Sequence, residues 1–323
     1  MKFKKDEISY VPQKPGVDGM YEMMEAAARI CYKTEDRIRD GSARRIVEDT
    51  IIPSGHTSVL EFGTVYLKFG VFRVGKWLKY LSDRYSRVKF HWSGMYVTTT
   101  YRTIMQGGYK DPIEAIRNKF DKDWRKDLEH WCEPTSHHHK RHCIRFVMDR
   151  VGSQSVMRHR GVYGISYAQE STRFVNYNRD RFDRSVTFSL PSKFYELLDQ
   201  INNEKDIMEN VREPISLNAM EWPLEEQLKF MRKCSPEWKT YENALKACEK
   251  AYMELTSAGW FPQDARGVLN LDVKTEFMMC AYPEDWDMWL FRRLDKHAHP
   301  HIQKIARTVN KYISTHKTEN NVG

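Results

Sequence analysis

The sequence predicts an α+β protein, in which strands dominate the first half of the chain and helices the second. Segments with strand-like alternation of apolar residues lie mainly before residue 150, and long segments with helical periodicity lie mainly after it. The two kinds of segment do not alternate as β-α-β units, which argues against a parallel sheet. With 323 residues and no linker rich in Pro, Gly or Ser, we expect a single domain over 1–323.

In the first half we expect one helix and three strands. Residues 18–32 are predicted to be helical, with Asp18 as the N-cap and one apolar face formed by Met20, Met24, Ala27 and Cys31. Residues 63–69 alternate as a half-buried strand after the turn-like segment SGHTSVLEF. Residues 96–104 are rich in β-branched and aromatic side chains and predict a second strand. A third is expected at 143–148.

The second half is predicted to be mostly helical, with helices at 192–204, 241–260, 261–269, 284–294 and 299–315. Gly259 stands where a C-terminal cap glycine would, and Pro262 is expected in the first turn of the next helix. Residues 272–281 are compatible with a strand or a short buried helix, because their periodicity favours neither.

Composition excludes several classes of protein. Hydrophobic residues make up 41% of the chain and aromatic residues 13%, too much for a disordered protein. No run of eighteen apolar residues is present, and the N-terminus lacks the apolar segment of a secretory signal. The net charge of +8 indicates an anionic partner, such as a nucleotide or nucleic acid. The cysteines form no CxxC pair, which predicts reduced thiols in a cytoplasmic protein: Cys31, Cys132, Cys143, Cys234, Cys248 and Cys280.

The stretch RHRGVYGISYAQESTRFVNY, residues 158–177, combines cations, hydroxyls and aromatic rings. The guanidinium groups of Arg158, Arg160 and Arg173 suit phosphate, because their forked donors bind two oxygens at once. Neighbouring aromatic rings could stack on a base, so the stretch predicts a nucleotide site. A solvated basic loop explains the same composition. Neither a GxGxxG fingerprint nor a GxxxxGK[ST] loop is present, so a dinucleotide would not be held by a Rossmann unit.

Two histidine tracts raise the possibility of a metal site. His297, His299 and His301 alternate near the C-terminus, but Pro300 interrupts them and no carboxylate or cysteine completes a familiar ligand set. The tract HHHKRH, residues 137–142, precedes a predicted strand and is expected to be an exposed loop. We therefore expect no functional metal, although a metal-dependent hydrolase stays an alternative.

Several segments together resemble the flavin-dependent thymidylate synthases. The RHR triplet at 158–160 is followed by AQESTRF, residues 168–174, as in that family. ARICYK and SGHTSVLE resemble its N-terminal segments, and DRVGSQSVMRHR resembles the approach to the triplet. Residues 249–269 and 286–302 resemble its C-terminal half in order and spacing. The resemblance implies a fold with an antiparallel sheet core and flanking helices. Only the region around 71–140 cannot be mapped and looks like an insertion.

The sequence also departs from the family's pattern. Ten residues separate Arg160 from Ser171, where the family's usual spacer has seven, and Gly161 and Gly164 fall in the expanded part, GVYGIS. Glycine tolerates the unusual dihedral angles that a loop extension needs. Phe174 stands where a tyrosine is common, and Phe62 where a histidine often follows the glutamate.

The resemblance implies the following residue roles. Deoxyuridylate would be held by Arg158, Gln169, Ser171, Arg173, Arg266 and Arg293, with Arg293 and Ser171 as the catalytic candidates. FAD would contact His56, Arg158, His159 and Arg160. NADPH and methylenetetrahydrofolate would be co-substrates, and no cysteine nucleophile is needed. Arg292 would face solvent or an interface. The assembly implied is a homotetramer with shared sites.

Residue-level alternatives remain beside these roles. Arg266 could instead form a surface salt bridge with Asp264, and His56 could be an inert turn residue. The same scaffold could also make a 5-hydroxymethyl pyrimidine nucleotide, because the expanded spacer lies beside the predicted site. From another class, the basic loop could bind nucleic acid, although no stable nucleic-acid partner and no membrane contact are expected.

Overall fold

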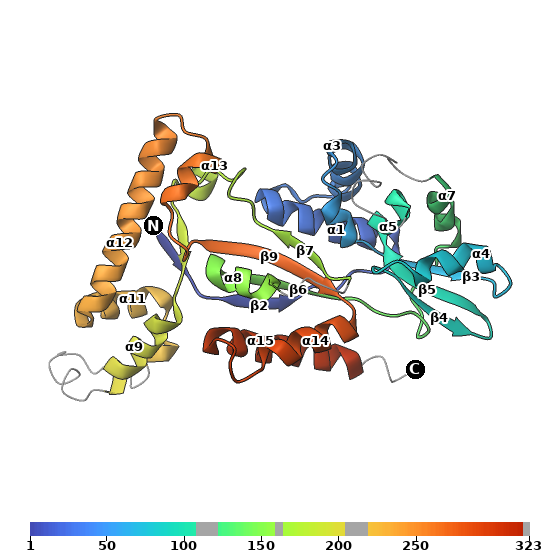
Figure 1. Ribbon diagram of the computed structural model, residues 1–323. Coiled ribbons are helices and arrows are strands. Elements are labelled where there is room, and N and C mark those ends of the chain that lie inside the picture. Colours follow the sequence, from blue (N-terminus) through green and yellow to red (C-terminus); the bar gives the residue numbers. More distant parts are fainter. Residues whose placement is uncertain (108–121, 159–163, 204–218, 319–323) are drawn as a thin grey trace. The chain divides into compact units, whose positions relative to one another are not determined.

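A computed structural model describes residues 1–107, 122–158, 164–203 and 219–318, and it mixes helices with mainly antiparallel sheets (Figure 1). The α+β class is therefore confirmed. The chain divides into two compact units. The first comprises Met1–Asp6, Met148–Gly152 and Thr172–Thr275, and the second comprises the rest. The single domain expected over 1–323 stays a prediction. No helix of the described chain is long and apolar enough to cross a membrane.

A four-stranded sheet forms the centre of the second unit. Its strands lie in the order β2 (Glu7–Tyr10), β6 (His142–Asp149), β9 (Lys274–Ala281) and β7 (Ser166–Gln169). β2 pairs antiparallel with β6, and β7 pairs antiparallel with β9. The strand predicted at 143–148 is thus confirmed. The ambiguous segment 272–281 is a strand whose side chains from Thr275 onward are buried. β7 carries the sequence that leads into Ser171.

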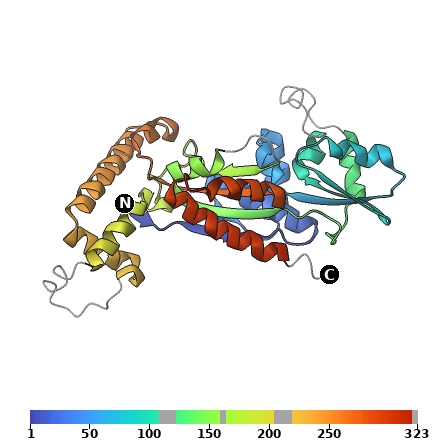
Figure 2. The same ribbon diagram turned by 60° about the horizontal axis from the view of Figure 1, so that its bottom comes forward.

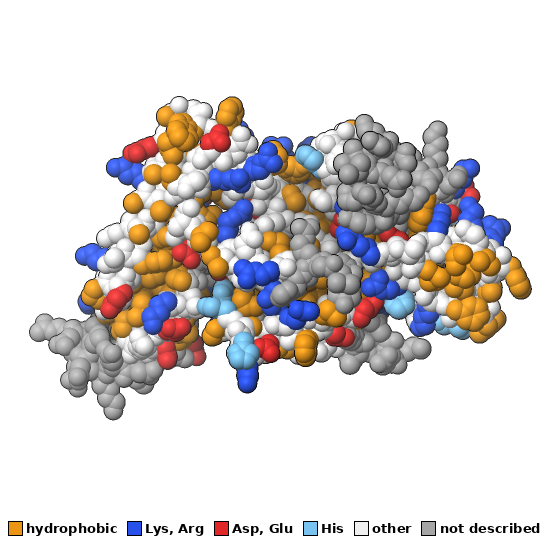
Figure 3. Space-filling model, in the orientation of Figure 1, with side chains coloured by type: hydrophobic (Ala, Val, Ile, Leu, Met, Phe, Trp, Pro, Cys, Tyr) orange, Lys and Arg blue, Asp and Glu red, His pale blue; other side chains and the backbone are white. Residues whose placement is uncertain are grey.

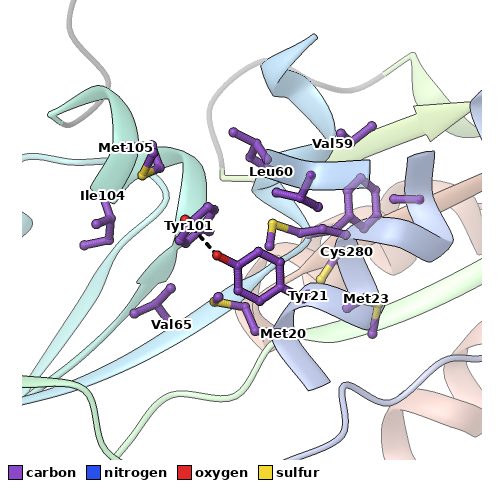
Figure 4. Packing of buried hydrophobic residues seen from close by; sticks show 14 of the residues in the cluster. Met20, Tyr21, Met23, Val59, Leu60, Val65, Tyr101, Ile104, Met105 and Cys280 are labelled. Atoms are coloured by element: carbon purple, nitrogen blue, oxygen red, sulfur yellow. Dashed lines mark hydrogen bonds between the residues drawn. The ribbon is translucent and has the colours of Figure 1, made fainter. Parts of the chain in front are cut away.

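Helix α1 (Gly16–Tyr32) packs its apolar face against this sheet (Figure 4). Met20, Met24 and Ala27 are buried in one cluster with residues of β6, β7 and β9, as the periodicity predicted. The prediction that Asp18 caps the helix is wrong, because the helix begins at Gly16 and Asp18 lies within its first turn. There the carboxylate still faces the positive end of the helix dipole.

Helices α14 (Pro283–Arg293) and α15 (Pro300–Thr318) lie side by side along the other face of the sheet (Figures 1 and 2). The indole of Trp286 donates a hydrogen bond of 3.0 Å to the carbonyl of His142 on β6. The hydroxyl of Tyr312 donates to the carbonyl of Ile8 on β2, at 3.3 Å. These bonds attach both helices to the sheet through polar groups. The helices predicted at 284–294 and 299–315 are confirmed.

A three-stranded antiparallel sheet, in the order β3 (Thr64–Phe69), β5 (Gly94–Thr100) and β4 (Arg87–His91), forms the other part of the second unit. The strand predicted at 63–69 is confirmed. The strand predicted at 96–104 ends earlier, because helix α5 (Tyr101–Gln106) begins directly after Thr100. The Thr100 hydroxyl accepts the Thr103 N–H as an N-cap, which ends the strand and starts the helix.

The region around 71–140 contributes a folded part of this unit where it is described. Asp127 is fully buried. It accepts a hydrogen bond of 2.8 Å from the Tyr80 hydroxyl and forms an ion pair of 2.6 Å with Lys79. On its outer surface, exposed hydrophobic side chains gather near helix α4 (Val74–Trp77) and strand β4 (Figure 3). Phe72 is 98% exposed and Trp92 is 81% exposed, an unusual placement for two large aromatic rings.

The first unit is largely helical. Strands β1 (Lys2–Lys4) and β8 (Thr187–Ser189) pair in parallel, beside the helices α9 (Ser192–Asn203), α11 (Leu224–Cys234), α12 (Pro236–Ser257) and α13 (Pro262–Ala265). Phe194 and Trp238 pack edge to face at 4.8 Å in one hydrophobic cluster of this unit. Gly259 has φ 93° and the Trp260 N–H bonds to the Leu255 carbonyl, so the predicted glycine cap is confirmed.

Candidate active site

Arg293 is the last residue of α14, and the spacing of that helix explains why it is buried. Trp286 and Trp289 are buried on the face that packs inward, and Arg293 follows Trp289 by one helical turn on the same face. Arg293 is 8% exposed, whereas Arg292 is exposed to solvent. The predicted division between the two arginines is therefore confirmed in their burial. Their chemical roles stay predictions.

The Arg293 guanidinium lies against the C-terminal end of helix α8 (Arg150–Met157). One of its terminal nitrogens donates to the carbonyl of Ser155, and the Trp289 indole donates to the next carbonyl, that of Val156, at 3.0 Å. Carbonyls at a helix end lack partners within the helix, so both hydrogen bonds hold α8 in place. The chain leaves α8 at Met157 and immediately enters the RHR triplet.

Part of the Arg293 donor capacity is unused. Its Nε is buried and has no hydrogen-bond partner among the described residues, and no carboxylate of the described chain forms an ion pair with it. Burial and the nearby Arg158 cation both lower the pKa of the Arg293 guanidinium. A buried cation next to a second cation is costly unless an anion compensates it. The arrangement is therefore suited to an anionic ligand.

Gln169 and Ser171 lie at the end of β7, close to α1 and α8. The Gln169 amide donates to the Ser153 hydroxyl of α8 at 2.9 Å, and the Ser171 N–H donates to the Cys31 carbonyl at 3.1 Å. The intervening Glu170 N–H bonds to the Glu276 carbonyl at 2.8 Å, which continues the pairing with β9 beyond the strand. The backbone that carries Ser171 is thus fixed on both sides.

His56 meets the C-terminal end of the same helix α1. Its ring nitrogen Nδ1 shares a short hydrogen bond with the hydroxyl of Tyr32, the last residue of α1. Burial raises the pKa of that hydroxyl, so it stays protonated. The imidazole itself is exposed and can reach a ligand. One helix end therefore contacts both His56, through Tyr32, and Ser171, through Cys31.

A second group of polar residues lies within the first unit, around the buried Thr172. Arg266 donates to the Thr172 hydroxyl at 3.0 Å and Arg150 donates to it at 3.3 Å. Arg150 also bonds to the Thr275 hydroxyl at 3.1 Å. Thr172 is one of the hydroxyls by which the stretch 158–177 was predicted to bind an anion. Sequence reasoning missed Arg150, because its partners lie far along the chain.

The salt bridge considered for Arg266 is not the contact that the structure contains. Arg266 is exposed and bonds to the Gln263 carbonyl at 3.1 Å and to Thr172, instead of to Asp264. Arg173 is also exposed, and its guanidinium lies 5.7 Å from the centre of the Phe174 ring. Both side chains remain accessible to an anion. Phe62 is completely buried in the core, which explains why an apolar residue is tolerated there.

The RHR triplet is only partly described. Arg158 is exposed just beyond α8, whereas His159 and Arg160 lie outside the described residues, together with 161–163 of the expanded spacer. Gly164 shows why the spacer needs this glycine: an added Cβ would lie 2.4 Å from the Arg84 carbonyl oxygen. Its φ is not in the left-handed region. The expectation of an unusual dihedral angle at Gly164 is therefore wrong, and close backbone approach is the reason for glycine.

The tract at 137–142 is not the exposed loop that was predicted. His138 is 6% exposed and its Nε2 lies 3.2 Å from the Leu67 carbonyl, and burial lowers its pKa to about 4. Arg141 and His142 are buried as well. These side chains are buried because the tract leads directly into β6. In the described parts of the chain, no group of three His, Cys, Asp or Glu residues could hold a metal ion.

Two comparisons with known proteins bear on this site. A family model described as thymidylate synthase complementing protein matches residues 135–316, more than half of the chain. A search of curated proteins found no match. The matched span contains Arg158, Gln169, Ser171, Arg266 and Arg293, and it excludes His56 and most of the region around 71–140.

Proposed function

Because this chain belongs to the thymidylate synthase complementing protein family, the flavin-dependent thymidylate synthases, we propose that it converts deoxyuridylate to thymidylate. Methylenetetrahydrofolate supplies the one-carbon unit and NADPH the electrons. FAD, when bound, passes those electrons on. The observation that carries the proposal is the family match over residues 135–316, a span that includes the buried Arg293 with its unused Nε.

The residues that surround α8 fit an anionic nucleotide. Arg293 offers a buried guanidinium with an unused N–H, and Arg158 adds a second, exposed cation nearby. In the proposed role, Arg293 lies against the uracil ring and stabilises the negative charge that develops on it, an effect worth roughly 3–4 kcal/mol in a preorganised site. Arg158, Gln169, Ser171, Arg173 and Arg266 hold the rest of deoxyuridylate, and Ser171 acts beside Arg293.

The donors available for FAD also fit that group. The exposed His56 ring is oriented by its hydrogen bond to Tyr32, and the exposed Arg158 guanidinium can donate to phosphate or ring-carbonyl oxygens. His159 and Arg160 complete this set in the proposal. We further propose a homotetramer in which several subunits contribute to each site, as the resemblance implies. The chain's task is to bind and orient its ligands and to place cations.

An absorption spectrum of the purified protein tests the first requirement of this function. A flavin spectrum that is retained through gel filtration, and that bleaches on addition of NADPH, is the expected result. A colourless protein that takes up no FAD when it is supplied would refute the proposal. Boiling the protein and chromatographing the released flavin identifies FAD and not FMN as the bound form.

A second candidate function is synthesis of a 5-hydroxymethyl pyrimidine nucleotide on the same scaffold. The observation that favours it is the close approach of Gly164 to the Arg84 backbone. Gly164 belongs to the expanded spacer, and Arg84 belongs to the region that the family model does not match. An insertion that packs on the spacer could change access of water to the reacting carbon. Mass spectrometry of the nucleotide product separates the two outcomes.

A further inference from the structure

A pocket of about 830 Å³ opens beside the C-terminal end of α1, within the second unit. Its lining comes from the end of α1, from the segment that follows it, and from α2 (Ser42–Arg45) with the π-helix Ile46–Ile51. Pockets of this size accommodate a nucleotide or a molecule of similar size. It shares no lining residue with the group around Arg293 and α8.

The rim of this pocket carries unpaired positive charge. Arg37, Arg39 and Arg45 line it, are exposed, and form no ion pair with a carboxylate of the described chain. Asp36 is the acidic residue of the lining. The neighbouring Arg44, which does not line the pocket, lies 3.8 Å from a carboxylate oxygen of Asp18 and 3.9 Å from one of Glu48. Three arginines around one cavity outnumber its one lining carboxylate, Asp36, and none of the three forms an ion pair with a carboxylate of the described residues, which indicates an anionic ligand.

The wall of the pocket is held by a buried carboxylate. Glu25, which is 2% exposed, accepts hydrogen bonds of 3.0 and 2.8 Å from Arg29 and of 2.8 and 2.9 Å from the Ser42 hydroxyl. The Ser42 hydroxyl in turn accepts the Arg39 N–H at 3.0 Å. Glu25 therefore neutralises Arg29 and fixes the turn that carries Arg39. The pocket is largely formed before any ligand arrives, which lowers the entropic cost of binding.

Two further features indicate a ligand site. The π-helix Ile46–Ile51 contributes Ile46 and Thr50 to the lining, and π-helical turns occur frequently at functional sites. The lining also includes Tyr32, whose hydroxyl is bonded to His56. The pocket thus combines cations and hydroxyls with an aromatic ring and isoleucine side chains. This combination matches a ligand with a phosphate end and a ring.

We propose that this pocket binds the phosphate-bearing end of a nucleotide, held by Arg37, Arg39 and Arg45. Guanidinium forks suit the oxygens of a phosphate, and the two isoleucines and Tyr32 provide surface for the sugar and base. Assignment of the occupant to a dinucleotide of the reaction, NADPH or FAD, rests on the proposed function. Binding of a phosphate-bearing nucleotide to the pocket does not.

Calorimetric titration of the full chain with ADP and with 2′,5′-ADP tests this inference without requiring turnover. Both titrations are repeated with excess deoxyuridylate to occupy a site at Arg293. The wild-type chain is expected to bind at least one of the two compounds under both conditions. A preference for 2′,5′-ADP identifies the 2′-phosphate of NADPH as the occupant, and a preference for ADP identifies the pyrophosphate that NADPH and FAD share. Equal affinity identifies the adenosine 5′-phosphate, which both compounds carry.

The double variant Arg39→Gln/Arg45→Gln is expected to bind about a hundredfold more weakly, roughly tenfold for each charge-assisted hydrogen bond that is removed. The matched control is Arg44→Gln, which removes an arginine of the same helix from outside the pocket and should bind as wild type. The single variant Arg37→Gln provides a second test should the double variant unfold. Wild-type affinity in the pocket variants, or binding of neither compound by the wild-type chain, would overturn the inference. Absence of flavin chemistry with retained ADP binding would refute the proposed function and leave the inference about this pocket standing.

Discussion

The guanidinium of Arg293 donates to the carbonyl of Ser155, three residues before Arg158. This bond joins the end of α14 to the end of α8, from which the chain enters the RHR triplet. It permits two explanations of the buried arginine. Arg293 could act on a ligand through its unused Nε, or it could serve only as a cap for the carbonyls of α8.

Replacing Arg293 with Ala separates these explanations. In the proposed role, the variant turns over deoxyuridylate about a hundred- to a thousandfold more slowly, as when one preorganised donor is removed, while FAD stays bound. Arg293→Lys, which keeps the charge, should recover part of the rate. Arg292→Ala is the control, because Arg292 is exposed on the adjacent face. If Arg293→Ala lowers both the thermal midpoint and FAD binding, and Arg293→Lys fully restores both, then Arg293 serves only as a cap for α8.

Arg150 is expected to support nucleotide binding, although sequence reasoning did not identify it. It shares the Thr172 hydroxyl with Arg266, one of the residues proposed to hold deoxyuridylate. We expect Arg150→Gln to weaken deoxyuridylate binding about tenfold and to leave FAD binding unchanged. Arg184→Gln, an exposed arginine paired with Asp180 in the same unit, should have no effect. Equal dissociation constants for wild type and Arg150→Gln would show that Arg150 is structural.

Gly164→Ala is expected to destabilise the protein by about 1–3 kcal/mol. The new methyl group would lie 2.4 Å from the Arg84 carbonyl oxygen, so the spacer or the backbone at Arg84 must move. Gly75→Ala is the matched control, because it lies in helix α4 with no atom within 4 Å of the added Cβ. Alanine also favours helix over glycine there. Denaturation midpoints of the two variants should therefore shift in opposite directions. A neutral Gly164→Ala would contradict the close packing.

Acid sensitivity between pH 6.5 and 4 is expected to depend on His138. Burial lowers its pKa from 6.5 to about 4, so in this window the unfolded chain binds a proton that the folded chain does not. The contribution of His138 to stability is therefore fully present above pH 6.5 and is lost as the pH falls. Asp285, whose pKa burial raises to about 6, acts in the opposite direction. Asp285 is present in both wild type and a His138 variant, so the difference between their stability-versus-pH curves isolates the contribution of His138.

The variant His138→Gln should lower stability at pH 7, because glutamine does not reproduce the buried packing, and its stability should fall less steeply between pH 6.5 and 4. The measurement is the free energy of unfolding from urea titrations across this range. His297→Gln, which alters an exposed histidine, should keep the wild-type pH dependence. Parallel curves for wild type and His138→Gln would show that His138 does not carry the effect.

Local patterns in the sequence predicted some of the regular elements, whereas strands such as β2, β4 and β7 were not predicted. Alternation at Val65, Leu67 and Phe69 and at Ile144, Phe146 and Met148 correctly predicted strands, because these side chains pack into the protein core. The pattern failed at 101–104, where β-branched residues predicted a strand but the Thr100 cap starts a helix. A cap acts through one hydroxyl, so it is a weaker sequence signal than a run of side chains.

The site was predicted less completely than the fold. The resemblance implied Arg293 rather than Arg292, and the burial of Arg293 agrees with its spacing after Trp289 in one helix. The pairing of Arg150 with Thr172 and Thr275 joins positions far apart in the chain, and local periodicity contains no information on it. The burial of His138 was missed for the same reason, because the Leu67 carbonyl that it meets belongs to another strand.

The mass of the nucleotide formed from deoxyuridylate, with FAD, NADPH and methylenetetrahydrofolate present, tests the central claim most directly. The proposed function predicts a product heavier by one methylene group that coelutes with thymidylate, and no product when the folate or FAD is omitted. A product that carries an additional oxygen would support the hydroxymethyl alternative instead. Unchanged deoxyuridylate, from protein with FAD bound, would contradict the account.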